Sequence, residues 1–193
     1  MRQLKDAQEL RAVTHPVRIA LLEVLHLNGV LTATEAGELI GETPTTCSFH
    51  LRQLAKYGFV EEAGGGTGRR RPWRAVARGL SFSSESSDAE VSIAATALES
   101  LLVKRWTARH EQWEQTRHFF PPEWRDAADV RQYVIYVTPT ELKEAFEAVG
   151  KALIGTYHDR IANPALRPEG AVPVEIMAMS HPLSQAPSKN PDL

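Results

Sequence analysis

Helix start and stop signals follow one another closely in the first third of this 193-residue chain. Thr32 begins a Thr-x-x-Glu capping box, and Gly41 stands where a left-handed C-terminal cap is expected. Thr43 and Pro44 then supply a capping hydroxyl and a proline ring suited to the first position of a helix. The pattern predicts one helix of about two turns, with Leu39 and Ile40 facing inward, then a tight turn and a second helix over residues 44–57.

Two further helices are predicted upstream of this pair. Apolar residues from Leu4 to Val13 recur at helical spacing, and the His15-Pro16 step ends that helix because the residue before a proline avoids helical dihedrals. The next helix begins at Pro16 and ends at Asn28-Gly29. Two short helices joined by a tight turn, with supporting helices before them, are the sequence outline of a helix-turn-helix.

A predicted β-hairpin follows the second helix of the pair. Residues 59–63 and 72–77 have the composition of strands, and the segment 64–71 between them is rich in glycine and arginine. A hairpin in this place is a wing. We therefore predict a winged helix-turn-helix domain over residues 1–80.

Four segments inside this domain carry a family resemblance. The segments are Thr14-His15-Pro16-Val17-Arg18, Leu31-Thr32-Ala33-Thr34-Glu35, Ser48-Phe49-His50-Leu51-Arg52-Gln53-Leu54 and Tyr57-Gly58-Phe59-Val60. With these four in order, the chain resembles the ArsR-type winged-helix transcription regulators of bacteria over residues 7–78. The resemblance implies a homodimer that binds operator DNA and releases it, or changes its grip, when an effector binds.

The second helix of the pair is the predicted recognition helix, placed in the major groove of double-stranded DNA. Its residues Cys47, Leu51 and Leu54 form one apolar stripe, and hydroxyl, amide and cationic groups suited to phosphates and base edges lie on the other faces. The sequence leaves two roles on this helix open. Phe49 either touches a thymine methyl or packs on a neighbour, and His50 either contacts phosphate or is a partly buried histidine. The predicted DNA-binding residues of the helix are Thr45, Thr46, Ser48, Phe49, His50, Arg52, Gln53 and Lys56.

Three arginines in the wing, Arg69, Arg70 and Arg71, are the other predicted DNA contacts. Glycines beside them allow the backbone to approach a phosphate closely, and arginines of this kind also enter a narrow minor groove. The alternative is a charged loop that never touches DNA. Regional charge favours DNA, because residues 1–80 hold 11 Lys and Arg against 8 Asp and Glu, a net +3, while the remainder holds 11 against 16, a net −5.

The second half of the chain has a different pattern. A serine-rich segment, 81–87, is the predicted linker to a dimerisation and possible effector domain over 88–181, and 182–193 is a predicted flexible tail. This domain consists of a long helix over 88–118 and a strand-helix-strand unit with strands at 131–138 and 172–179. The predicted fold class is therefore mainly α with small β elements (α+β).

The long helix carries an apolar stripe that one small domain does not cover, which predicts a homodimer. Aromatic residues crowd its distal end, where they either line a pocket for an unknown small-molecule effector or pack as plain core. The strand-helix-strand unit either senses an effector or enlarges the dimer interface. The aromatic candidates are Trp106, Trp113, Phe119, Phe120 and Trp124.

His110, Glu114 and His118 lie at i, i+4 and i+8 of the long helix, a spacing that can gather metal ligands on one face. The first helix of the helix-turn-helix lacks cysteine, and Cys47, the chain's single cysteine, lies on the apolar stripe of the other helix. We therefore predict no metal and no cofactor, with a metal-responsive sensor as the alternative.

Several functional classes are disfavoured by what the sequence lacks. It has no P-loop, dinucleotide fingerprint, nucleophile elbow or His-Glu-x-x-His motif, so we do not expect an enzyme. No run approaches the roughly 20 apolar residues of a membrane helix, no signal peptide is evident, and a single cysteine fits a reducing compartment, which together predict a cytoplasmic protein without a membrane partner. A winged helix that serves as a protein-interaction module remains the alternative to DNA binding.

Overall fold

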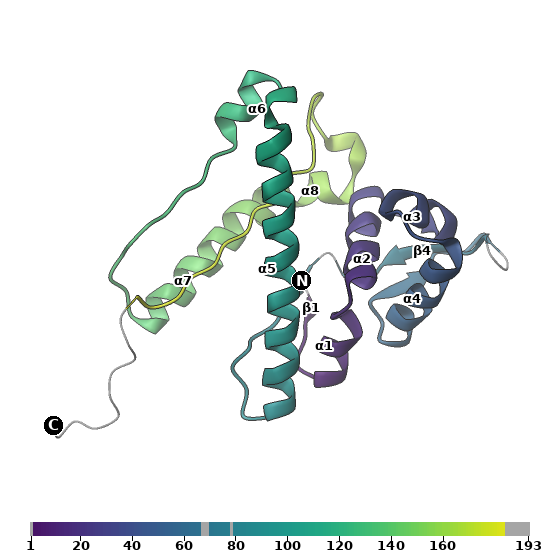
Figure 1. Ribbon diagram of the computed structural model, residues 1–193, viewed down its shortest axis with the longest axis horizontal. Coiled ribbons are helices and arrows are strands. Elements are labelled where there is room, and N and C mark those ends of the chain that lie inside the picture. The colour runs from purple at the N-terminus through teal and green to yellow at the C-terminus, as the bar shows by residue number, and fades with distance from the viewer. Residues whose placement is uncertain (1, 67–69, 78, 184–193) are drawn as a thin grey trace.

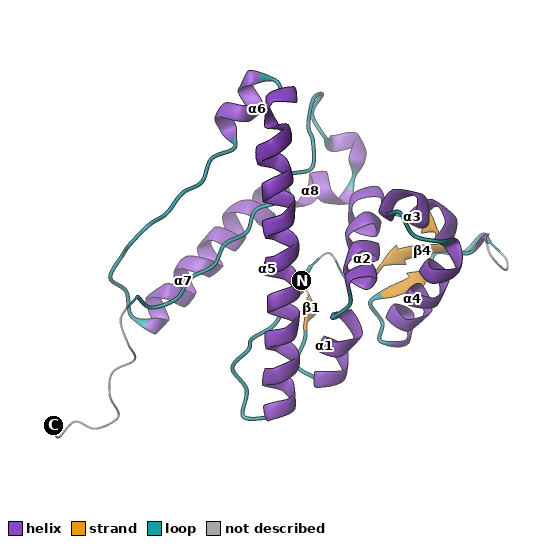
Figure 2. Cartoon of the chain, in the orientation of Figure 1, coloured by secondary structure: helices purple, strands orange, loops and turns teal. Residues whose placement is uncertain are grey.

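Helices form most of the chain, and two small sheets join them in the N-terminal half (Figure 1). The computed structural model describes residues 2–66, 70–77 and 79–183. The N-terminal half contains four helices, and a long helix, α5, runs along its side (Figure 2). The bounds are α1 Ala7–Val13, α2 Pro16–Asn28, α3 Ala33–Ile40, α4 Pro44–Lys56 and α5 Ala89–Thr116.

The predicted helix signals act as expected. The Thr32 hydroxyl accepts a hydrogen bond from the Glu35 amide, and the Glu35 carboxylate accepts one from the Thr32 amide at 2.7 Å, which completes the capping box of α3. Gly41 ends α3 with a φ of 73°, a left-handed conformation that glycine adopts without steric cost. The predicted inward position of Leu39 is wrong: its side chain is 54% exposed, because this eight-residue helix buries Ala33, Ala36 and Gly37 instead.

Two sheets connect the helices. The three-stranded antiparallel sheet has the order β2-β4-β3, in which β3 and β4 are the predicted wing hairpin and β2 is a strand the sequence did not indicate. The second sheet is a parallel pair in which Arg2 is opposite Leu80 and Gln3 is opposite Ser81, so Ser81 belongs to a strand rather than to the predicted linker. The bounds are β1 Arg2–Gln3, β2 Leu31–Thr32, β3 Val60–Glu62, β4 Pro72–Ala75 and β5 Leu80–Ser81.

The hydrophobic core lies entirely between Leu4 and Leu98 in the described residues. It is formed by α1 to α4, the wing strand residue Trp73 and the first half of α5, whose Ala95 and Leu98 are fully buried. Helix α5 packs on α1. The apolar stripe of α5 that we expected to require a second subunit is therefore partly covered by the chain's own α1.

The chain beyond α5 is helical but has no core of its own. Thr138 and Glu141 form the predicted capping box of α7, which continues through a π turn into α8 (Figure 1). Of the residues beyond Leu98 whose side chains are described, none is buried. No helix in the described residues is long and apolar enough to span a membrane. The elements are η2 Arg117–Phe119, α6 Pro122–Ala127, α7 Pro139–Gly150, η3 Lys151–Gly155, α8 Thr156–Ala162 and η4 Pro164–Leu166.

The two predicted C-terminal strands are wrong for this structure. Segments 131–138 and 172–179 flank the expected helix, but neither joins a sheet. A strand is stabilised by hydrogen bonds to a neighbour, and these two segments do not pair with each other or with another described strand. Their β-branched and aromatic side chains consequently remain exposed: Tyr133 74%, Val134 66%, Ile135 60%, Tyr136 103%, Val174 64% and Ile176 62%.

Candidate nucleic-acid interface

Helix α4 begins at a fixed point because its N-terminus is capped. The Thr43 hydroxyl accepts a hydrogen bond from the Thr46 amide at 3.1 Å, and Pro44 occupies the first helical position. The inner face then carries Cys47, Leu51 and Leu54, all fully buried. Burial raises the pKa of the Cys47 thiol, so this cysteine is a neutral core residue.

The turn between α3 and α4 is tight enough to require glycine inside α3. A Cβ atom at Gly37 would lie 2.6 Å from the backbone oxygen of Glu42 and 3.5 Å from the Cys47 sulfur. The Glu42 amide also donates to the Gly37 carbonyl at 3.0 Å. Close backbone packing at Gly37 therefore fixes the angle at which α4 leaves the turn.

The outer face of α4 contains the predicted DNA-binding side chains. Thr45, Phe49, Arg52 and Lys56 are exposed, and Phe49 is 57% exposed. Thr46, Ser48 and Gln53 lie on the flanks and are half-buried. Within the described residues, Arg52 makes no hydrogen bond or ion pair, so its guanidinium is available to an external acceptor.

His50 lies apart from this face. Its side chain is 8% exposed, and its ring contacts that of His15 with a centroid distance of 4.4 Å. His15 itself caps α2, because its Nδ1 accepts a hydrogen bond from the Val17 amide. Burial lowers the pKa of both histidines, and the positive charge of Arg18 acts in the same direction. His50 therefore joins α4 to the start of α2 as a neutral side chain, and it is more deeply buried than the partly buried histidine considered from the sequence.

Arg2 holds the other end of α4, a contact that sequence patterns did not indicate. Its guanidinium donates to the carbonyls of Tyr57 and Gly58 at 2.8 and 2.7 Å, and it stacks 4.1 Å from the ring centroid of Phe59. An ion pair with Glu9 completes its surroundings. A cation at the last carbonyls of a helix complements the helix dipole. No local spacing signals this contact, since Arg2 and Tyr57 are more than fifty residues apart.

The wing carries both acidic and basic side chains. Arg74 lies directly opposite Glu61 across the hairpin and pairs with it at 2.7 Å, and Arg71 pairs with Glu62 at 2.7 Å. Both pairs are close to half-exposed, so each contributes little to stability. Arg70 is exposed. The predicted contact Arg69 lies outside the described residues.

The aromatic and metal candidates do not converge on one site. Trp106 stacks on His110 at 5.1 Å, Trp113 meets Phe120 edge-on at 4.8 Å, and Phe119 is 78% exposed. Trp124 is half-buried on the separate helix α6. Glu114 pairs with Arg117, and His118 lies against Phe119. Among the described residues, no three His, Cys, Asp or Glu side chains gather as a metal site would require.

Comparison with known proteins locates one recognisable domain. Residues 13–63 match a family described as a helix-turn-helix domain. Among solved structures, the chain is similar to an ArsR family transcriptional regulator, at 20% identity over 55% of this chain and 88% of the other, with a TM-score of 0.31. It is also similar to a MarR family transcriptional regulator from Silicibacter pomeroyi, at 18% identity over 76% of this chain and 74% of the other, with a TM-score of 0.33. No curated protein matches the chain.

The matched segment and the geometry agree. It extends from the end of α1 to the end of the first wing strand, so it contains α3, α4 and the turn between them. With the β3-β4 hairpin behind α4, this is a winged helix-turn-helix, the fold of DNA-binding transcriptional regulators. The predicted winged helix-turn-helix class is confirmed.

Proposed function

We propose that this protein is a homodimeric, sequence-specific transcription regulator in which α4 enters the major groove of DNA. The observation that carries the proposal is the outer face of α4, where Thr45, Arg52 and Lys56 are exposed while the inner face anchors the helix in the core. Helices presented in this way contact base edges and phosphates together. His50 is too deeply buried to contact DNA directly and is not among the proposed contacts.

The wing is the second proposed contact. Arg70 is exposed, and Arg71 exchanges its pair with Glu62 for a phosphate or a narrow minor groove. Arg69 is included from the sequence. Because phosphate contacts carry no sequence information, the wing contributes affinity and α4 contributes specificity.

The proposed homodimer is supported by the surface beyond α5. The large apolar side chains in 130–137, with Phe146 and Val149 on α7, are 40% exposed or more, an unusual amount for a chain acting alone. A two-fold dimer would place two α4 helices about one DNA turn apart. Light scattering at micromolar concentration tests this part, because finding only a 21.4 kDa species contradicts it.

The DNA test uses selection of bound fragments from random DNA, followed by fluorescence anisotropy over a series of salt concentrations. We expect Arg52→Ala or Ser48→Ala to reduce the preference for the selected sequence by about 1–3 kcal/mol. Replacing Arg69, Arg70 and Arg71 by alanine should weaken selected and unrelated DNA alike and lower the salt slope by up to about 3.

Lys104→Ala is the matched control, since Lys104 is an exposed cation on α5 outside the proposed interface. It should leave both DNAs bound as in the parent protein. No enrichment of any sequence, together with binding that is insensitive to salt, would favour a protein-interaction module instead.

A further inference from the structure

A cavity of about 560 Å³ lies between α5, α7 and the C-terminal segment. This volume is in the range of sites that hold small organic molecules. Its wall is polar and apolar in about equal measure, and two of the chain's three methionines contribute to it. Methionine adapts its shape to different ligands. The polar part includes Ser83, Ser84 and Ser180, and the larger apolar lining residues are Phe82, Leu102, Val103, Phe146, Met177 and Met179.

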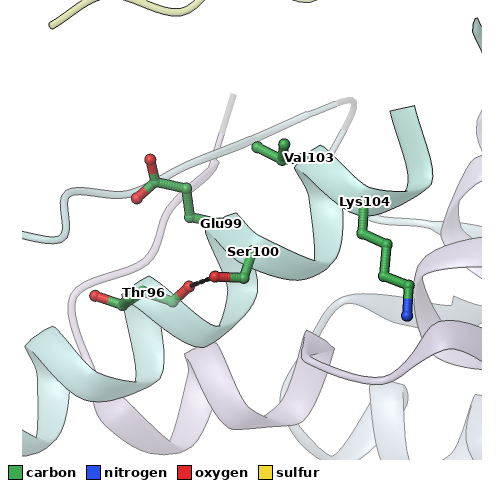
Figure 3. A pocket seen from close by; sticks show the side chains of 5 residues that line it. All are labelled: Thr96, Glu99, Ser100, Val103 and Lys104. Carbon is green, nitrogen blue, oxygen red and sulfur yellow. Dashed lines mark hydrogen bonds between the residues drawn. The ribbon is translucent and has the colours of Figure 1, made fainter. Parts of the chain in front are cut away.

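One charged group lines the cavity. Glu99 projects from the same side of α5 as Val103, one turn further along, and both also line an adjoining cavity of about 480 Å³ (Figure 3). Glu99 is exposed to solvent and makes no ion pair or hydrogen bond with the residues that the structure describes, whereas Ser100 beside it donates to the Thr96 carbonyl. A carboxylate without a protein partner beside an apolar wall is complementary to a cation that carries an apolar body.

The wall of the cavity is connected to the helix-turn-helix by ion pairs. Glu175 lies two residues before Met177 on the C-terminal segment and pairs with Arg109 of α5. The other terminal nitrogen of Arg109 lies 3.0 Å from a Glu23 oxygen on α2, and Arg105 holds the same oxygen at 2.6 Å. Helix α2 packs on α3 and α4. These ion pairs form a continuous side-chain link from the segment that carries Met177 to the helix that supports the turn.

We propose that this cavity binds a small amphipathic cation, an amine or quaternary ammonium compound with an aromatic or alkyl body. We further infer that the Glu175, Arg109 and Glu23 pairs couple its occupation to DNA affinity. The coupling rests on the proposed function, while the binding does not. The site is separate from the aromatic cluster at the distal end of α5.

Calorimetric titration of the full chain with three matched probes tests the binding. The probes are 4-phenylbutylamine, 4-phenylbutanol and 4-phenylbutyrate, which share one apolar body and differ in charge. We expect the amine to bind at least about tenfold more tightly than the alcohol, and the acid to bind most weakly. Glu99→Gln should reduce the affinity for the amine to that for the alcohol. Phe146→Ala should weaken all three.

Glu111→Gln is the matched control, because Glu111 is an exposed glutamate on α5 about 18 Å along the helix from Glu99. Circular dichroism verifies that each variant is folded. Absence of binding for all three probes, or an amine preference that survives Glu99→Gln, overturns the proposal. So does weaker dimerisation of the Phe146→Ala variant without amine binding, because the cavity would then be a surface covered by a second subunit.

Anisotropy with labelled DNA tests the coupling. Saturating amine should change DNA affinity in the parent protein by a few-fold, and Glu175→Gln should remove this response while amine binding persists in the calorimeter. An equal response in both proteins overturns the relay. If no DNA is bound although the amine binds, the proposed function has failed and the ligand site stands.

Discussion

Residues up to 98 and residues beyond 98 both contain amphipathic helices, but only the first region buries their apolar faces. Leu10, Leu21, Leu51 and Leu98 are fully enclosed in the first region. In the second, Phe146 on α7 remains 40% exposed. Both regions have well-capped helices, since the box at Thr138 has the same hydrogen bonds as the box at Thr32. Capping thus defines where a helix begins, whereas packing against other elements buries its apolar face.

Truncating one side chain in each region tests whether both regions contribute to folding stability. Leu51→Ala should lower the free energy of unfolding by about 2–5 kcal/mol, because it leaves a cavity in the core beneath α4. Ile135→Ala should change it by less than about 0.5 kcal/mol at concentrations too low for self-association, since this side chain is 60% exposed. Urea titrations followed by circular dichroism measure both. Similar losses would show that the second region has a core.

An arginine in each region provides the second test. Arg2→Ala should cost about 1–3 kcal/mol, because it removes charged hydrogen bonds to the last carbonyls of α4 and leaves Glu9 without its partner. Arg131→Ala should leave unfolding unchanged, since its pair with Asp129 is exposed to water. The same urea titrations compare the two variants. An unchanged midpoint for Arg2→Ala would mean that water replaces its contacts without loss.

Self-association tests whether the exposed apolar side chains of the second region form a dimer interface. Replacing Tyr133 and Ile135 together by glutamate should weaken dimerisation at least about tenfold, because it brings charge into an apolar contact. The denaturation midpoint of a dilute sample should not move. Sedimentation velocity over a concentration series measures the dimer dissociation constant. An unaltered constant would place the dimer contact elsewhere.

The smallest expected effect concerns pH. The pKa values of His15 and His50 are lower in the folded protein than in the unfolded chain, so the unfolded chain binds protons first on acidification. Stability should therefore be flat above about pH 6.5 and fall as pH decreases below it, by at most about 1.4 kcal/mol per pH unit for each proton. His50→Gln should flatten this slope in urea titrations at several pH values, whereas His181→Gln, on an exposed residue, should not.

Local signals predicted much of the winged helix-turn-helix. The capping residues Thr32, Gly41 and Thr43 fixed both helices of the turn, and helical spacing separated Cys47 and Leu51 from the exposed face of α4. These signals work because a cap or an apolar stripe depends on neighbours within one or two turns.

The misses depend on distant partners. Strands β1 and β5 have two residues each and no periodicity, so nothing in the sequence indicates that Gln3 lies opposite Ser81. Arg2 likewise contacts Tyr57, which is 55 residues away in the sequence. Conversely, segment 131–138 has strand composition without a strand to pair with, and composition alone does not supply one.

Helix α5 also has a mechanical consequence. It has 28 residues and is therefore about 42 Å long. Its first turns pack against α1 around Ala95 and form a pivot near one end, while the ion pairs of Arg105 and Arg109 with Glu23 would resist a tilt about it. A tilt of about 5° at that pivot would swing the Trp113 end by roughly 2–3 Å, given a rise of about 1.5 Å per residue. Small angular changes at the core are thereby amplified into displacements as wide as an atom at the far end of the molecule.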